Sequence, residues 1–117
     1  MDMALQRALV SSIRHWERDA LMAIAVKRVV PLMDSDSCAL CSLFIEQSCL
    51  QCPLVEIGQR CPCYGSVWCS YNIQRHKFND AKTPDKKEKA LKKAEVAARR
   101  MIKMLKELFE KAKTEAA

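Results

Sequence analysis

Seven cysteines, all between residues 38 and 69, are the residues of this sequence best suited to chemistry. Four of them form two CxxC pairs, Cys38 with Cys41 and Cys49 with Cys52. Each CxxC pair supplies two thiolates, and two pairs supply the four ligands of a tetrahedral structural zinc site. The sequence therefore predicts a metal-binding segment, with zinc as the favoured ion.

The remaining cysteines and one histidine leave the ligand set open. Cys61 and Cys63 compete for a place in it, while Cys69 is expected to be a small buried thiol. His15 either supplies a nitrogen ligand, if an N-terminal helix packs over the site, or simply supports the neighbouring tryptophan. The alternative cofactor is an iron–sulfur cluster, because the Cys-Pro pair at 52–53 matches the end of a ferredoxin motif whose preceding cysteines are absent.

No catalytic set accompanies these cysteines. A catalytic zinc keeps an open coordination position beside a general base, whereas here thiols are in excess and the only acids among them are Glu46 and Glu56. The sequence also contains no HExxH or P-loop motif and no recognisable Ser-His-Asp set. We therefore expect a protein without enzymatic activity.

The segment before the cysteines, residues 1–33, has the periodicity of a helix. One apolar stripe recurs at helical spacing and consists of Leu5, Leu9, Ile13 and Trp16. Residues 19–30 either extend this helix or form a second buried segment, and Pro31 is expected to end it, because a residue before proline avoids the α conformation. Further helices are expected at about 37–48 and, with Ser70 as N-cap, near 70–79.

Residues 83–115 carry the strongest helical pattern. Thr83 is the expected N-cap and Pro84 the first helical residue. Apolar residues then recur every three or four positions, as in a heptad seam: Leu91, Ala94, Ala98, Met101, Leu105, Leu108 and Ala112. The simplest expectation is that this seam packs on the N-terminal stripe within one chain, and a homodimer through the C-terminal helix is the alternative.

The formal charge of +6 comes entirely from the C-terminal part. Residues 1–81 hold eight basic and eight acidic side chains, whereas residues 82–117 hold twelve basic and six acidic ones. The candidates for binding a partner or nucleic acid are the cations opposite the seam: Lys89, Lys93, Arg99, Arg100 and Lys103. Such a face can contact phosphates, although a solvated helix face is the plainer explanation, since acids interrupt it.

Composition places these segments in one all-α domain spanning residues 1–117. Two glycines and four prolines are too few for a turn-rich β fold. We expect three to four helices stapled by a cysteine-rich metal-binding loop at 34–69, with a long amphipathic C-terminal helix. No apolar run reaches the roughly 18 residues of a membrane span, and no signal peptide is evident, which favours the cytoplasm.

Three motifs together resemble a set of small, largely uncharacterised bacteriophage and prophage proteins of zinc-binding type. They are Ser12-Ile13-x-His15-Trp16, Cys38-x-Leu40-Cys41 and Cys49-x-x-Cys52-Pro53, and the likeness covers roughly residues 5–68. The resemblance implies a phage origin, the cytoplasm of a bacterial host, Cys63 rather than Cys61 as the later ligand, and more weight for His15.

The resemblance also bears on function, because small phage proteins often act by binding host proteins. It implies a host protein or complex as partner, with inhibition of a bacterial defence system, such as a CRISPR effector, as one role. The alternative is a zinc protein that binds nucleic acid through the basic C-terminal helix.

Overall fold

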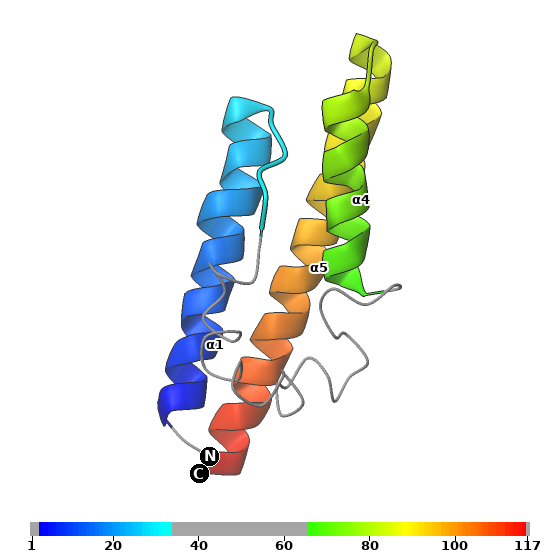
Figure 1. The fold of residues 1–117 in the computed structure, drawn as a ribbon. Helices are drawn as coiled ribbons and strands as arrows, with labels where there is room; N and C mark the ends of the chain where they lie inside the picture. The colour runs from blue at the N-terminus through cyan, green and yellow to red at the C-terminus, as the bar shows by residue number, and fades with distance from the viewer. Residues whose placement is uncertain (1–2, 34–65, 117) are drawn as a thin grey trace.

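The computed structural model describes residues 3–33 and 66–116, and these residues form helices without any strand. An N-terminal rod, Met3–Lys27, consists of α1 (Met3–His15) followed by two π-helical runs, η1 (Trp16–Leu21) and η2 (Ala23–Lys27). It is followed by α4 (Val67–Asp80) and the long α5 (Pro84–Ala116). The three helical rods lie side by side in Figure 1. The expected all-α class and long C-terminal helix are confirmed, while the expected metal loop and the helix at 37–48 lie outside the described residues.

The N-terminal rod continues past residue 19, so the segment after α1 extends the first helix. Its winding changes at Trp16, where hydrogen bonds span five residues, as in the bond from the Met22 N–H to the Glu17 carbonyl. The rod ends at Lys27, before Pro31 is reached, because Arg28 adopts the left-handed conformation with φ 57°. This left-handed residue, and not the proline, therefore ends the helix.

The start of α4 differs from the expected one. The helix begins at Val67, and its N-cap is Ser66, whose Oγ accepts a hydrogen bond from the Cys69 N–H at 3.0 Å. Ser70, the expected cap, lies inside the first turn, where its hydroxyl donates to the Ser66 carbonyl at 3.2 Å. Both serines fit the cap preference, and the sequence prediction chose the wrong one.

The start of α5 is as expected. Thr83 precedes the helix, and its Oγ1 accepts a hydrogen bond from the Lys86 N–H at 3.3 Å. Pro84 then occupies the first helical position, where its missing N–H costs no hydrogen bond. The connection from α4 to α5 is short, so the two helices pack side by side in an antiparallel hairpin (Figure 1).

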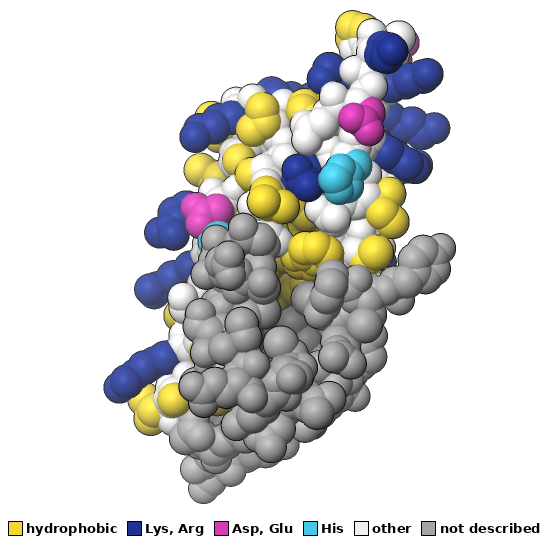
Figure 2. All heavy atoms as spheres, viewed as in Figure 1, with side chains coloured by type: hydrophobic (Ala, Val, Ile, Leu, Met, Phe, Trp, Pro, Cys, Tyr) yellow, Lys and Arg dark blue, Asp and Glu magenta, His cyan; other side chains and the backbone are white. Residues whose placement is uncertain are grey.

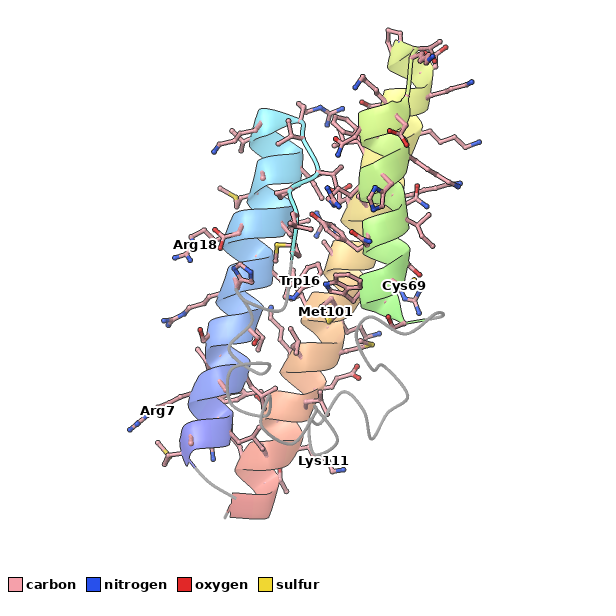
Figure 3. All side chains as sticks on the ribbon, in the orientation of Figure 1. Arg7, Trp16, Arg18, Cys69, Met101 and Lys111 are labelled. Atoms are coloured by element: carbon pink, nitrogen blue, oxygen red, sulfur yellow. The ribbon has the colours of Figure 1, made fainter. Side chains whose placement is uncertain are left out.

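One hydrophobic core joins all three rods. The seam of α5 faces inward, with Ala94, Ala98 and Leu105 at 0–1 % exposure. It packs in the same cluster as the N-terminal stripe and as Val67 and Tyr71 of α4. Figure 3 shows Trp16 and Met101 pointing between the rods, and Arg7 pointing away from them. The prediction that the seam and the N-terminal stripe pack within one chain is confirmed.

Hydrogen bonds connect α4 to residues 31–33, which follow the N-terminal rod. The Tyr71 hydroxyl donates to the Pro31 carbonyl at 2.6 Å, and the Trp68 indole N–H donates to the Met33 carbonyl. The Tyr71 ring also meets Trp16 edge to face, with centroids 5.1 Å apart. Residues 31–33 are therefore held against the first two turns of α4. Among the described helices, none is long and apolar enough to cross a membrane.

Candidate functional site

The outer face of α5 carries all five basic residues that the sequence singled out. Every one of them is exposed. Arg99 pairs with Glu95 at 3.3 Å along the helix. Within the described ranges no acid pairs with Lys89, Lys93, Arg100 or Lys103. The face therefore offers four cations that no acid of the described residues neutralises.

These five residues do not converge on one site, because they turn toward different neighbours. Arg99 and Lys103 line a groove against η1 that also holds Glu17, Glu107 and Glu110. There Lys106 pairs with Glu17 at 3.4 Å, so the charge is mixed.

A second groove, between α4 and α5, is far more basic, and we call it the basic groove. It has a volume of about 530 Å³, and its charged and imidazole side chains are His76, Lys77, Asp80, Lys86, Lys89 and Lys93. Lys89 and Lys93 thus belong to a group of four lysines with a single acid. Figure 2 shows Lys and Arg gathered at this end of the molecule, near the turn from α4 into α5.

Sequence reasoning missed two lysines of the basic groove. Lys86 lies three residues before Lys89, which lies four before Lys93, so the i, i+3, i+7 spacing on one helix face could have identified it. Lys77 comes from α4, and only the packing of α4 against α5 brings it there. The four ammonium groups can attract phosphates or carboxylates.

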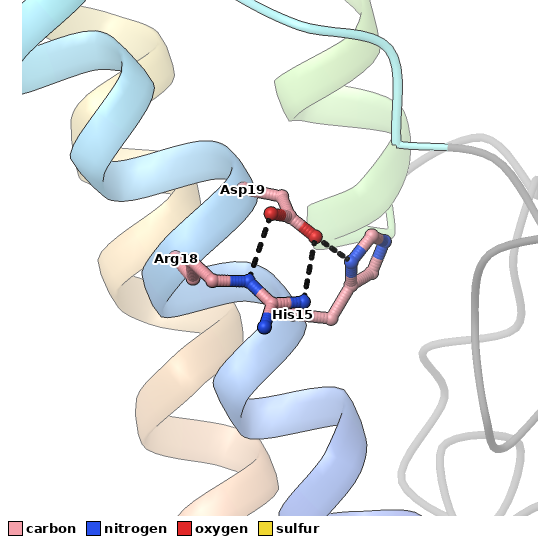
Figure 4. Close-up of polar contacts among 3 residues, drawn as sticks. All are labelled: His15, Arg18 and Asp19. Carbon is pink, nitrogen blue, oxygen red and sulfur yellow. Dashed lines mark hydrogen bonds and ion pairs between the residues drawn. The ribbon is translucent and has the colours of Figure 1, made fainter.

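His15 is the one predicted metal ligand within the described residues. It sits at the end of α1 with its side chain 17 % exposed, and its Nδ1 lies 2.6 Å from the Asp19 Oδ2 one turn further on. The Arg18 guanidinium also donates to Asp19, at 3.1 Å (Figure 4). The hydrogen bond from Arg18 has the largest effect on the pKa of the Asp19 carboxyl and holds it below its usual value; burial opposes this, and the hydrogen bond with His15 adds a smaller lowering effect. Asp19 is therefore an ionised acceptor for the imidazole.

The other predicted metal ligands lie outside the described residues: Cys38, Cys41, Cys49, Cys52, Cys61 and Cys63. Cys69 is a half-buried free thiol in the first turn of α4. In the described part of the chain, no three His, Cys, Asp or Glu residues come together as a possible metal site.

The described residues define an all-α fold in which three helical rods pack together and a basic groove runs between α4 and α5. Comparisons with protein-family models, with curated proteins and with solved structures found no match to this chain.

Proposed function

We propose that this chain is a non-enzymatic zinc-binding protein of phage type that acts by binding an acidic surface of a host protein or complex. A bacterial defence complex, such as a CRISPR effector, is the partner that the sequence resemblance suggests. Zinc, bound by cysteines of the 38–63 segment, would have a structural role and stabilise the fold.

The observation that carries the proposal is the outer face of α5, where no acid of the described residues pairs with Lys89, Lys93, Arg100 or Lys103. The apolar seam of this helix is buried in the chain's own core, so its polar side remains for a partner. Lys93, Arg100 and Lys103 are exposed there around Val96, which is 58 % exposed. Cations around an apolar side chain suit an interface with an apolar centre and a charged rim.

A pair of matched charge reversals tests this surface. We expect Lys93→Glu with Arg100→Glu to weaken partner binding roughly tenfold or more, since each lost ion pair is worth up to about 1 kcal/mol. Arg7→Glu with Arg14→Glu changes the charge equally on the exposed side of α1 and should leave binding unchanged.

The measurement is affinity capture from nuclease-treated host lysate, followed by titration of the captured protein. Equal binding by the two double variants would refute the role of the α5 face. Failure to recover any protein partner, combined with capture of nucleic acid before nuclease treatment, would favour the second candidate below.

The zinc proposal has its own test. We expect about one zinc per chain, and a lower melting temperature after chelation, because metal binding to a folded site stabilises the fold. Elemental analysis and thermal unfolding with and without chelator measure both. A folded protein that contains no metal and does not respond to chelator would contradict this part of the proposal.

The basic groove favours a second candidate, binding of nucleic acid phosphates. If its four lysines each neutralise a phosphate, the logarithm of the affinity should fall with that of the salt concentration with a slope of about −3.6, or roughly 150-fold from 50 to 200 mM. Lys89→Ala should reduce the slope by about one unit. Fluorescence titration with a labelled oligonucleotide measures it, and an affinity insensitive to salt would exclude this candidate.

A further inference from the structure

A groove along α1, reaching Phe109 of α5, is lined by three arginines, and we call it the arginine groove. It has a volume of about 540 Å³, and its cations are Arg7, Arg14 and Arg18. Among the described residues, no acid lines it. Figure 2 shows basic side chains projecting along the left edge of the molecule, over the N-terminal rod. The groove therefore presents positive charge that belongs neither to the outer face of α5 nor to the basic groove.

The alignment of the arginines follows from the periodicity of the helix. Positions 7, 14 and 18 are separated by seven and four residues, which is two turns and one turn, so the three side chains share one face. At about 1.5 Å per residue, Arg7 and Arg14 lie roughly 10 Å apart along the axis. Figure 3 shows Arg7 and Arg18 pointing away from the rods on the same side. With the further turn to Arg18, the row of guanidinium groups is about 15 Å long.

Two of these arginines have no acid to neutralise them. In the described part of the chain no acid pairs with Arg7 or Arg14, and both side chains are exposed. Arg18 differs, because its Nε and Nη2 donate to Asp19, whose carboxylate offsets its charge. A guanidinium without such a partner offers a planar fork of N–H donors that binds a phosphate through two parallel hydrogen bonds. Arg7 and Arg14 are therefore the principal anion-binding groups of the groove.

The same groove also contains apolar surface and an aromatic ring. Met3 is 60 % exposed, and Val10 and Phe109 line the groove beside the arginines. Phe109 is partly buried against the core, which fixes the position of its ring. The Lys113 ammonium group lies 5.4 Å from the centre of this ring, so a cation adjoins the aromatic wall as well. A positive groove with an aromatic side chain is typical of proteins that bind single-stranded nucleic acid, where phosphates meet the cations and bases stack on the ring.

We propose that the arginine groove binds a short stretch of single-stranded nucleic acid, with phosphates on Arg7 and Arg14 and a base against Phe109. A row of about 15 Å spans roughly four nucleotides at a rise of about 3.4 Å per nucleotide. The exposed Ser11 hydroxyl, between the two arginines, adds a hydrogen-bond donor for a phosphate. A duplex keeps its bases paired and stacked, so it offers no free base to the ring. This binding is separate from that of the protein partner and from the basic groove.

Fluorescence anisotropy of the full-length protein with a labelled single strand of about 12 nucleotides, within the usual site size, measures this binding over a series of salt concentrations. We expect Arg7→Ala and Arg14→Ala each to reduce the slope of the logarithm of the affinity against that of the salt concentration by about 0.7, and the double variant by about 1.4. Lys27→Ala removes an exposed cation from the other end of the same rod and should leave the slope unchanged.

Two further variants separate a specific site from plain attraction between charges. Arg14→Lys keeps the charge but loses the guanidinium fork, so the slope should stay the same while the affinity falls several-fold. Phe109→Leu keeps an apolar side chain against the core but removes the ring. It should weaken binding of the single strand about fivefold or more and leave binding of a duplex of the same length unchanged. Thermal unfolding of each variant checks that the fold is retained.

Three results would overturn the proposal. Equal slopes for the wild type and the double arginine variant would show that the groove contacts no phosphate, and a lower slope in Lys89→Ala would then assign the binding to the basic groove. Equal affinity for single strand and duplex, with no effect of Phe109→Leu, would show that no base contacts the ring. Tighter binding of polyglutamate than of the oligonucleotide would assign the groove to acidic polypeptides. The α5 face is tested through Lys93 and Arg100, so its proposal stands or fails separately.

Discussion

Replacing Tyr71 by Phe removes one buried hydroxyl and keeps the aromatic ring. Tyr71 is 1 % exposed, and its hydroxyl donates to the Pro31 carbonyl at 2.6 Å. The net contribution of such a hydrogen bond is about 0.5–1.5 kcal/mol, and the unpaired carbonyl adds to the loss. We therefore expect Tyr71→Phe to lower the free energy of unfolding by about 1–2 kcal/mol at pH 7, while the ring still packs against Trp16.

The same contact predicts a dependence on alkaline pH. Burial raises the pKa of the Tyr71 hydroxyl well above its usual value, whereas in the unfolded chain it is about 10. Because the folded pKa is the higher one, the stabilising effect is complete below pH 10 and is lost as the pH rises toward the folded pKa. At pH 11 the unfolded state has gained about 1.4 kcal/mol from ionising this tyrosine.

The wild type should therefore lose most of its advantage over Tyr71→Phe between pH 9 and pH 11. Urea denaturation of both proteins at several pH values, followed by tryptophan fluorescence, measures the difference directly, and other titrating groups cancel between the two. A difference that stays constant up to pH 11 would show that the hydroxyl is not buried in the folded state. No difference at pH 7 would refute the hydrogen bond itself.

Five further substitutions address the ends of the helices and the core. Arg28→Gly should raise the free energy of unfolding by roughly 0.5 kcal/mol, because the gain of about 1 kcal/mol from a glycine in the left-handed conformation is reduced by loss of the exposed ion pair between Arg28 and Glu88. A loss of stability would show that this ion pair contributes more than the backbone. Ser66→Ala should lower the free energy of unfolding by about 1 kcal/mol, and Ser70→Ala should lower it by less. The reverse order would show that Ser70 is the N-cap of α4. Leu9→Ala should lower the free energy of unfolding by about 3–4 kcal/mol, since Leu9 is fully buried. Leu32 is 53 % exposed, so Leu32→Ala should change the free energy of unfolding by no more than about 0.5 kcal/mol. Denaturant unfolding measures all of them, and a similar cost at both leucines would contradict the described core.

The helical architecture could be predicted because local and tertiary preferences agree in α5. Thr83 and Pro84 mark its start, and the apolar seam repeats at helical spacing over most of its length, so a single pattern determines both the helix and its buried face. The N-terminal stripe is equally regular up to Trp16. These are the elements for which expectation and structure coincide.

The details that the sequence could not provide are those decided by packing. Nothing in residues 16–27 distinguishes a π-helical winding from an α-helical one, since both bury Trp16, Ala20 and Ile24 on one side of the rod. The left-handed Arg28 has no sequence signal either, because arginine is not a residue favoured in that conformation. At α4, two serines four residues apart were both acceptable caps, and the choice follows from Val67 being buried at the first position.

The candidate sites were predictable to different extents. The basic groove needed the packing of α4 on α5 to add Lys77, whereas Lys86 could have been found from spacing alone. The partner of His15 was also within reach, because Asp19 is four residues away on the same helix. The sequence could not predict that the Nε2 of His15 is buried without a hydrogen-bond partner, because the burial of one ring nitrogen depends on the folded chain.

The described contacts also bear on what a metal could add to this fold. The bonds from Tyr71 to Pro31 and from Trp68 to Met33 already hold the residue before position 34 close to the start of α4. A zinc bound only by cysteines of the 38–63 segment would therefore add constraint mainly within that segment. Removal of such a metal should leave the packing of Trp16 against Tyr71 in place, because that packing depends on contacts between the described helices and residues 31–33. The tryptophan fluorescence of the folded protein should therefore change little on chelation, and a large change would show that the metal also supports the helical core.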